Sequence, residues 1–216
     1  MPRVIAAGER WLLLEWLEPA RATDAAWSDF GARLAALHAP RQQRSGWPQD
    51  NYIGLLPQSN DWTADWAEFW RAHRLEPQAE RARASGLLGR GDADRFEELY
   101  ARLPELLAAG QADGSSLLHG DLWSGNVHAT GGSIALIDPS CSYGHREVDL
   151  AMAALFGGFP EPFWIAYERA APCEPRGART RRAIYQLYYL LVHVNLFGSG
   201  YVGRTRTTLT EALSGK

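Results

Sequence analysis

The sequence predicts an α+β fold that is predominantly helical. Segments with apolar residues at helical spacing cover most of the 216-residue chain, whereas only three or four short apolar runs have the length of strands. The polar residues that stand out follow one of these runs, so we expect a small hairpin-like element, and no large sheet, to carry them. A chain of this length forms one large domain, or one domain plus a fragment.

The composition argues against several classes of partner. The net charge is −3, from 22 basic and 25 acidic residues, which gives no electrostatic basis for binding nucleic acid or an anionic membrane. The two cysteines form no C-x-x-C motif, and no apolar run approaches the length of a membrane span. The simple interpretation is a protein of the reducing cytoplasm. Lys216 is the only lysine, so no internal lysine can hold a phosphate.

The first elements are expected as a strand, a helix and a loop. The apolar run at residues 10–19 closes with Glu-Pro and has the length of a buried strand. A helix should follow, with Thr23 as its N-cap and Pro40 as its stop, because apolar residues recur on one face between them. Residues 41–62 are rich in Gly, Pro, Asn and Asp, and are expected to form a long loop of the kind that is often functional.

The remainder of the chain is expected to be helical on both sides of a short strand. That strand is "SIALID", which follows the polar motif described next. Helices are predicted at residues 63–84, 92–109, 147–156, 161–170, 178–197 and 205–214.

The motif "HGDLWSGN" places His119, Asp121 and Asn126 directly after an apolar run, and Asp138 follows in "IDP". About a dozen residues between Asn126 and Asp138 are enough for a hairpin that would bring these two side chains together. Phosphoryl transfer needs a group that accepts the nucleophile's proton, and oxygen ligands for Mg²⁺. The spacing H-x-D-x-x-x-x-N with a later Asp matches that need. We therefore predict Asp121 as the base, Asn126 and Asp138 as magnesium ligands, and His119 as a residue that orients the loop.

Other interpretations of these residues explain less. Each one alone could form an Asx-turn or a cap, but that does not explain the whole set at these intervals. A pair of carboxylates for glycoside hydrolysis leaves Asn126 without a role. A zinc site is disfavoured because the six histidines show no H-E-x-x-H motif and no Cys partner at ligand spacing.

Three longer stretches carry a family resemblance: "LLHGDLWSGNV", "IDPSCSYGHREVDLAMAALFGGFP" and "YQLYYLLVHVNLFGSGYV", together with "DNYIG" at residues 50–54. They resemble the fructosamine kinase (ketosamine-3-kinase) family of aminoglycoside-phosphotransferase-like kinases, over residues 3–203. The resemblance implies the C-terminal lobe of a protein-kinase-like fold, with the hinge and last strands of the N-terminal lobe. It also implies an ATP- and Mg²⁺-dependent kinase that phosphorylates the 3-hydroxyl of ketosamines (fructosamine or ribulosamine adducts), a deglycation activity.

The resemblance also implies roles for individual residues. Asp121 matches the family's catalytic base, and Asn126 and Asp138 match its metal ligands. Backbone groups of Glu15 and Leu17 would meet the adenine edge. Trp123 would stack on the sugar, or pack in the core instead. Asn51 and Tyr52 of "DNYIG" would wall the substrate pocket, or serve the structure alone. His145 would face substrate or anchor the loop, and His119 and Asp149 would support the loop.

The chain departs from the family pattern near its beginning. It has no Gly-rich phosphate loop and no internal lysine, both of which such kinases carry in an N-terminal lobe. Residues 1–20 are therefore expected to be a remnant of that lobe and the hinge, and residues 21–216 the C-terminal lobe with the catalytic loop and a helical substrate region. Weak or absent activity is expected, or alternatively an inactive lobe that binds sugar amines or a protein. An exposed hinge strand would favour a homo-oligomer.

Overall fold

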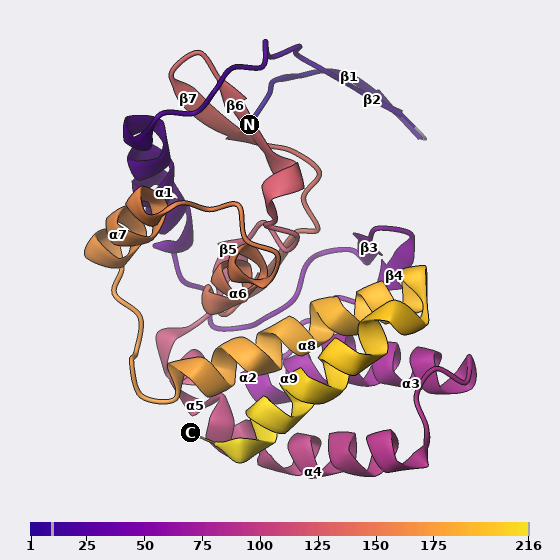
Figure 1. Cartoon of the computed structure of the whole chain (residues 1–216). Helices are drawn as coiled ribbons and strands as arrows, with labels where there is room; N and C mark the ends of the chain where they lie inside the picture. Colours follow the sequence, from indigo (N-terminus) through magenta and orange to yellow (C-terminus); the bar gives the residue numbers. More distant parts are fainter. Residues whose placement is uncertain (10, 216) are drawn as a thin grey trace.

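The computed structural model describes residues 1–9 and 11–215, and it shows the mostly helical α+β fold that the sequence predicts (Figure 1). Its strands are short and pair two by two, all antiparallel: β1 (Val4–Gly8) with β2 (Trp11–Leu14), β3 (Asn51–Ile53) with β4 (Leu56–Gln58), β5 (Ser116–Leu118) with β8 (Ser142–Gly144), and β6 (Val127–Thr130) with β7 (Ser133–Leu136).

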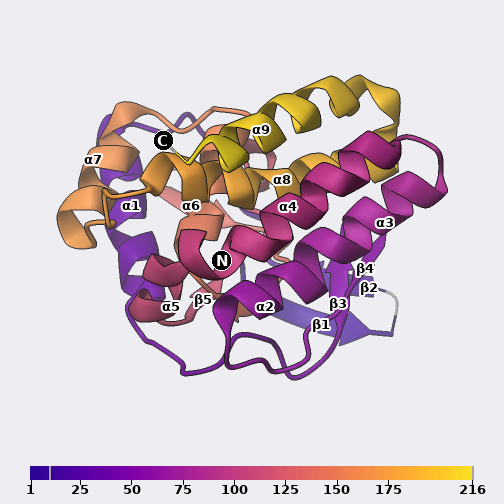
Figure 2. The same cartoon turned by 90° about the horizontal axis from the view of Figure 1, so that it is seen from below.

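The helices form two groups. One group contains α1 (Asp24–His38) and α7 (Glu161–Ala170), which lie side by side next to the β6–β7 hairpin (Figure 1). The other contains α2 (Trp66–Trp70), α3 (Glu76–Ala84), α4 (Arg90–Leu106), α5 (Ala108–Asp113), α8 (Ala178–Phe197) and α9 (Val202–Ser214). Figure 2 shows α3 and α4 beside α8 and α9 in this second group.

Helix α6 (Glu147–Leu155) lies between the two groups and contributes to both of their cores. Its Val148, Met152 and Leu155 are buried in the larger core with the apolar faces of α2, α4, α8 and α9. Its Ala153 is buried in the smaller core with residues of α1 and α7. Since apolar burial is the main favourable term in folding, α6 is the element that joins the two halves.

Most of the predicted helices agree closely with the structure. Thr23 caps α1 as expected, because its hydroxyl accepts a hydrogen bond of 3.2 Å from the amide of Ala26. The helix predicted over residues 63–84 is interrupted by a π-helical turn, Arg71–Leu75, between α2 and α3. Within this turn Arg74 buries its guanidinium against the Phe69 ring, 4.7 Å from the centroid.

The predicted loop at residues 41–62 contains the β3–β4 hairpin, which the sequence analysis missed. Each strand has three residues, too few for an alternating pattern to stand out. The two-residue connection contains Gly54, whose φ of 56° favours glycine.

The β1–β2 hairpin projects from the rest of the molecule (Figure 1). Its apolar side chains are largely exposed, with Trp11, Leu12 and Leu13 all more than half accessible. Self-association through this strand remains a prediction. No helix in the described part of the chain is long and apolar enough to cross a membrane.

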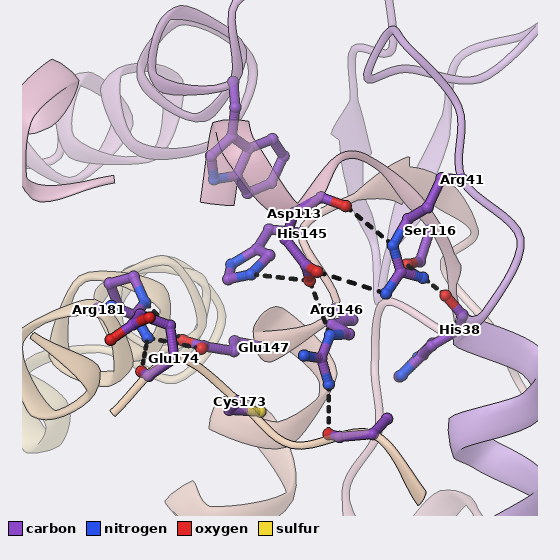
Figure 3. A network of polar contacts seen from close by, with 12 residues as sticks. His38, Arg41, Asp113, Ser116, His145, Arg146, Glu147, Cys173, Glu174 and Arg181 are labelled. Atoms are coloured by element: carbon purple, nitrogen blue, oxygen red, sulfur yellow. Dashed lines mark hydrogen bonds and ion pairs between the residues drawn. The ribbon is translucent and has the colours of Figure 1, made fainter. Parts of the chain in front are cut away.

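A buried network of charged residues holds the turn between β8 and α6 (Figure 3). Asp113, at the end of α5, accepts a 2.7 Å hydrogen bond from the Arg146 guanidinium and lies 3.5 Å from His145 Nε2. Arg181 of α8 forms two hydrogen bonds with Glu147, of 2.8 and 2.7 Å. These pairs connect α5, α6 and α8 around the start of α6. Hydrogen bonding to His145, and then to Arg146, holds the pKa of Asp113 well below its usual range although burial opposes this.

We expect Asp113→Asn to lower the free energy of unfolding at pH 7 by about 1.5–3 kcal/mol, because it removes charge-assisted hydrogen bonds. A carboxyl group whose pKa is lowered by folding stabilises the folded state at pH values above its unfolded-state pKa of about 3.9. This contribution is lost as the pH falls from about 3.9 toward the folded-state pKa. The difference in free energy of unfolding between Asp113→Asn and the parent chain, measured by urea unfolding, should therefore be smaller at pH 3 than at pH 7. As a control, Asp29→Asn removes an exposed pair with Arg33 and should change stability by less than about 1 kcal/mol. An equal loss at both pH values would contradict this account.

Candidate active site

The loop that follows β5 is held by one buried carboxylate, that of Asp149 on α6. Its two oxygens accept the backbone amides of His119 and Gly120, at 2.8 and 2.9 Å. Its Oδ2 also lies 3.2 Å from His38 Nε2 of α1. Burial acts to raise the pKa of Asp149, but the hydrogen bond and charge of His38 outweigh it, so the pKa is lowered and the carboxyl stays ionised. Asp149 therefore supports the loop, as predicted, by accepting hydrogen bonds from its backbone amides.

Gly120 is required where the loop turns. Its φ is 79°, and a Cβ at this position would lie 1.9 Å from the Ser140 carbonyl oxygen. The Gly120 carbonyl accepts a hydrogen bond of 2.8 Å from the Tyr189 hydroxyl of α8. His119 reaches the other side of the loop, where its Nε2 is 2.9 Å from the carbonyl of Ile137. These contacts place Asp121 between the hairpin and α8.

Around the β6–β7 hairpin, the Asn126 side chain contacts the Asp121 carboxylate and the backbone of Asp138; the predicted convergence of the Asp138 side chain stays a prediction. Asn126 ends the short 3₁₀ turn Ser124–Asn126 before β6, and Asp138 follows β7. The Asn126 amide nitrogen donates to Asp121 Oδ2 at 3.1 Å and to the Asp138 carbonyl at 3.4 Å. The Ile137 amide closes the base of the hairpin onto the Asn126 carbonyl at 3.1 Å.

Asn126 and Asp138 carry oxygen atoms of the kind that a hard divalent cation prefers. The Asn126 side-chain nitrogen donates hydrogen bonds, and its Oδ1 accepts none from the described residues. The Asp138 carboxylate is exposed and likewise unpaired in the part of the chain that the structure describes. Asp138 also has a φ of 50°, the one non-glycine residue with positive φ in the described chain. Such backbone conformations gather at functional sites.

Asp121 has the electrostatic environment of a proton acceptor. Burial raises the pKa of Asp121 to about 6, although the charge of His119 and the hydrogen bond from Asn126 oppose this rise. The charges of Asp149 and Asp138 raise it further. A carboxylate with a raised pKa holds a transferred proton more firmly than an ordinary aspartate.

The segment containing Glu15 and Leu17 lies against the hairpin. His128 Nε2 of β6 is 2.7 Å from the Leu17 carbonyl, and the Ala20 amide donates to the Ala129 carbonyl at 2.9 Å. The Glu15 amide is bonded to the Arg3 carbonyl at 2.8 Å. The Glu15 carbonyl and the Leu17 amide have no hydrogen-bond partner among the described residues, so one acceptor and one donor are available there.

A cavity of about 520 Å³ opens beside Asp121. Trp123 lines it and is 39% exposed, so this residue does not pack in a core. The ring lies against Gly125, because a Cβ there would be 2.2 Å from its Cη2 atom. Ser124 also lines the cavity and contacts Gly158, where a Cβ would lie 2.6 Å from the serine Cβ.

Asn51, Tyr52 and His145 do not line this cavity, although Ile53 and Gly54 of the same "DNYIG" segment do. His145 is 3% exposed, with Nδ1 2.8 Å from the Tyr185 hydroxyl and Nε2 directed to Asp113 (Figure 3). The Asn51 side chain donates to the Cys141 carbonyl and accepts from Gln58 and Asn60. Tyr52 is exposed, and its carbonyl accepts the Ser140 hydroxyl. Asn51 and His145 thus act as structural residues here.

The sequence analysis missed the α8 side of the cavity. Tyr189, His193 and Phe197 line it, and they recur at a spacing of four along one helical stripe. The stretch "YQLYYLLVHVNLFGSGYV" had been noted for its resemblance, but a stripe of aromatic residues on a helix resembles ordinary core. His38 was missed for the same reason.

The fold and the site together are those of a kinase-like phosphotransferase. A family model described as Fructosamine kinase matches residues 1–215. The chain is 42% identical to a probable ketoamine kinase of Synechocystis sp., over 96% of this chain and 69% of that protein. It is 38% identical to a chloroplastic protein-ribulosamine 3-kinase of Oryza sativa subsp. japonica, over 86% of this chain and 54% of that one. The chain belongs to the fructosamine kinase family.

Solved structures agree with this assignment. A candidate fructosamine-3-kinase from Thermobifida fusca superposes with a TM-score of 0.92 at 37% identity, covering 99% of this chain and 73% of that one. The aminoglycoside phosphotransferase APH(2'')-IIa in complex with gentamicin shares the fold, with a TM-score of 0.58 at 17% identity, over 99% of this chain and 72% of that one. The expectation that an N-terminal lobe is largely absent and activity therefore weak is not supported, since the family model matches residues 1–215.

We expect Gly125→Ala to raise the KM for the phosphoryl acceptor severalfold, with a smaller effect on kcat, because the new methyl group displaces the Trp123 ring from the cavity wall. Steady-state kinetics with varied acceptor would measure both constants. Gly91→Ala is the matched control, since a Cβ there meets no atom within 4 Å. A Gly125→Ala enzyme with an unchanged KM would show that the ring position is unimportant for binding.

Proposed function

We propose that this chain transfers the γ-phosphoryl group of ATP to the 3-hydroxyl of a ketosamine, the adduct of a sugar with an amine. The observation that supports the proposal is that Asp121, which lines a 520 Å³ cavity, is hydrogen-bonded to Asn126, and that Asn126 also contacts the Asp138 backbone. The family's kinase activity implies ATP as the phosphoryl donor. The names of two relatives, ketoamine kinase and protein-ribulosamine 3-kinase, support a ketosamine as the acceptor.

In this proposal Asp121 accepts the proton of the attacking hydroxyl. The hydroxyl oxygen forms a bond to the γ-phosphorus, and the bond from that phosphorus to the β–γ bridging oxygen breaks, which releases ADP. The raised pKa of Asp121 favours proton acceptance, and about 6 is still low enough for the carboxyl to be mainly ionised at pH 7. The hydrogen bond from Asn126 holds one carboxylate oxygen, Oδ2, in place.

Asn126 Oδ1 and the Asp138 carboxylate would hold Mg²⁺, which neutralises charge on the phosphates when bound. The β6–β7 hairpin and the hydrogen bonds from the loop amides to Asp149 hold the reacting groups in position, on which such catalysis depends.

The nucleotide base and the sugar would bind on opposite sides of Asp121. The Glu15 carbonyl and the Leu17 amide offer one acceptor and one donor, the pair that the amino edge of adenine requires. On the other side, the exposed Trp123 ring would stack on the apolar face of the sugar.

We expect Asp121→Asn to lower kcat for ketosamine phosphorylation by about 10²–10⁴, because the amide cannot accept the proton. The thermal midpoint and the binding of ATP in the presence of Mg²⁺ should stay close to those of the parent chain. The assay is ADP release with a synthetic fructosamine as acceptor.

Asp94→Asn is the matched control, since Asp94 is exposed on α4. It should keep parent activity. If the Asp121→Asn chain turned over as fast as the parent, the base assignment would be wrong. If the parent chain bound the acceptor without phosphorylating it, the alternative of a binding lobe would stand instead.

A further inference from the structure

The cavity beside Asp121 is lined in part by a cluster of aromatic rings around His193. The His193 ring centroid is 4.8 Å from that of Phe156, 4.9 Å from that of Tyr201 and 5.4 Å from that of Phe197. These four residues, here called the aromatic box, come from the end of α6, from α8 and from the 3₁₀ turn Ser199–Tyr201. All four line the cavity that Asp121 and Trp123 also line.

Within the box, His193 presents one ring nitrogen as an acceptor. Its Nδ1 lies 2.8 Å from the Tyr189 carbonyl, and a carbonyl oxygen only accepts, so Nδ1 carries the hydrogen. Burial lowers the pKa of His193, and the Arg204 charge lowers it further, against the effect of the Tyr189 carbonyl. The imidazole is therefore neutral at pH 7. Its Nε2 lone pair has no partner among the described residues.

The one charged side chain among the described residues that line the cavity is acidic, whereas the cationic Arg204 lies just outside it. Among the described residues that line the cavity there is no lysine or arginine, and Asp121 is the one carboxylate. Arg204 lies outside the box, with its guanidinium 5.5 Å from the centroid of the Phe156 ring and bonded to the Leu155 carbonyl. Aromatic rings attract an ammonium group through their quadrupole, most strongly where water is excluded.

We propose that the aromatic box binds the protonated amine of the ketosamine, with His193 Nε2 accepting its N–H and the rings of Phe156, Phe197 and Tyr201 facing its charge. This inference rests on the proposed function. In a ketosamine, three carbon atoms separate the amine nitrogen from the 3-hydroxyl oxygen, and Asp121 and the box line one cavity, so a single bound molecule would place its hydroxyl at Asp121 and its amine toward the box. The box would then distinguish a glycated amine from a free sugar.

The test compares two acceptors that differ in one atom: N-propyl-1-amino-1-deoxyfructose and its ether counterpart, 1-O-propylfructose. We expect the parent chain to prefer the amine by at least about tenfold in kcat/KM. His193→Phe keeps an aromatic ring but removes the acceptor, and should lower kcat/KM for the amine about tenfold while changing the ether less than about threefold. Phe197→Leu alters a side chain that is 65% exposed, and should lower kcat/KM for the amine about twofold to fivefold.

His73→Phe is the matched control, because His73 is also a partly buried histidine in contact with an aromatic ring, but it lies outside the cavity. It should leave the ratio of amine to ether unchanged. A parent chain that phosphorylates both acceptors equally well would overturn the box while the kinase assignment stands. Equal losses on both acceptors in His193→Phe would likewise overturn it.

Calorimetric binding of the two acceptors makes the comparison independent of turnover. A chain that binds the amine tightly, loses this in His193→Phe and phosphorylates neither compound would support the box and contradict the proposed reaction. Equal binding of the two compounds would contradict the box whatever the turnover.

Discussion

The buried carboxylate of Asp149 is the constraint on which the rest of the site depends. It accepts two consecutive loop amides and contacts His38, so removing it would leave buried donors unpaired. Because α6 is packed in both apolar cores, the loop is positioned relative to both halves of the molecule at once. The hydrogen bond between His38 and the Tyr167 hydroxyl, 2.8 Å long, extends this support to α7.

The site combines two kinds of surface. The hairpin side carries oxygen atoms without partners among the described residues, which suits a metal ion and phosphates. The α8 side carries aromatic rings and one neutral histidine, which suits a sugar and its amine. Asp121 lies where the two surfaces meet, partly buried by both, and this burial is the main cause of its raised pKa.

The positions of the site residues around one hairpin could be predicted from the sequence because they depend on local spacing. Asp121, Asn126 and Asp138 lie within one short stretch, so a turn is enough to bring them together. His193 and His38 could not be found this way, since their partners come from distant segments and their helical pattern resembles core. His145 shows the opposite failure: it stands in a polar motif, yet tertiary contacts with Asp113 and Tyr185 bury it. The β3–β4 hairpin was missed because its strands are so short.

The hydrogen bonds that join residues 17–20 to the β6 strand bear on how many phosphates a bound nucleotide would need. The Leu17 carbonyl and the Ala20 amide tie the segment proposed for adenine directly to the hairpin that bears Asn126. In the proposed binding mode, these two hydrogen bonds, one from the His128 side chain and one between backbone groups, would fix the distance between the purine and the terminal phosphate. A nucleoside triphosphate would contact both the proposed adenine segment and the hairpin residues, whereas AMP would contact only the adenine segment.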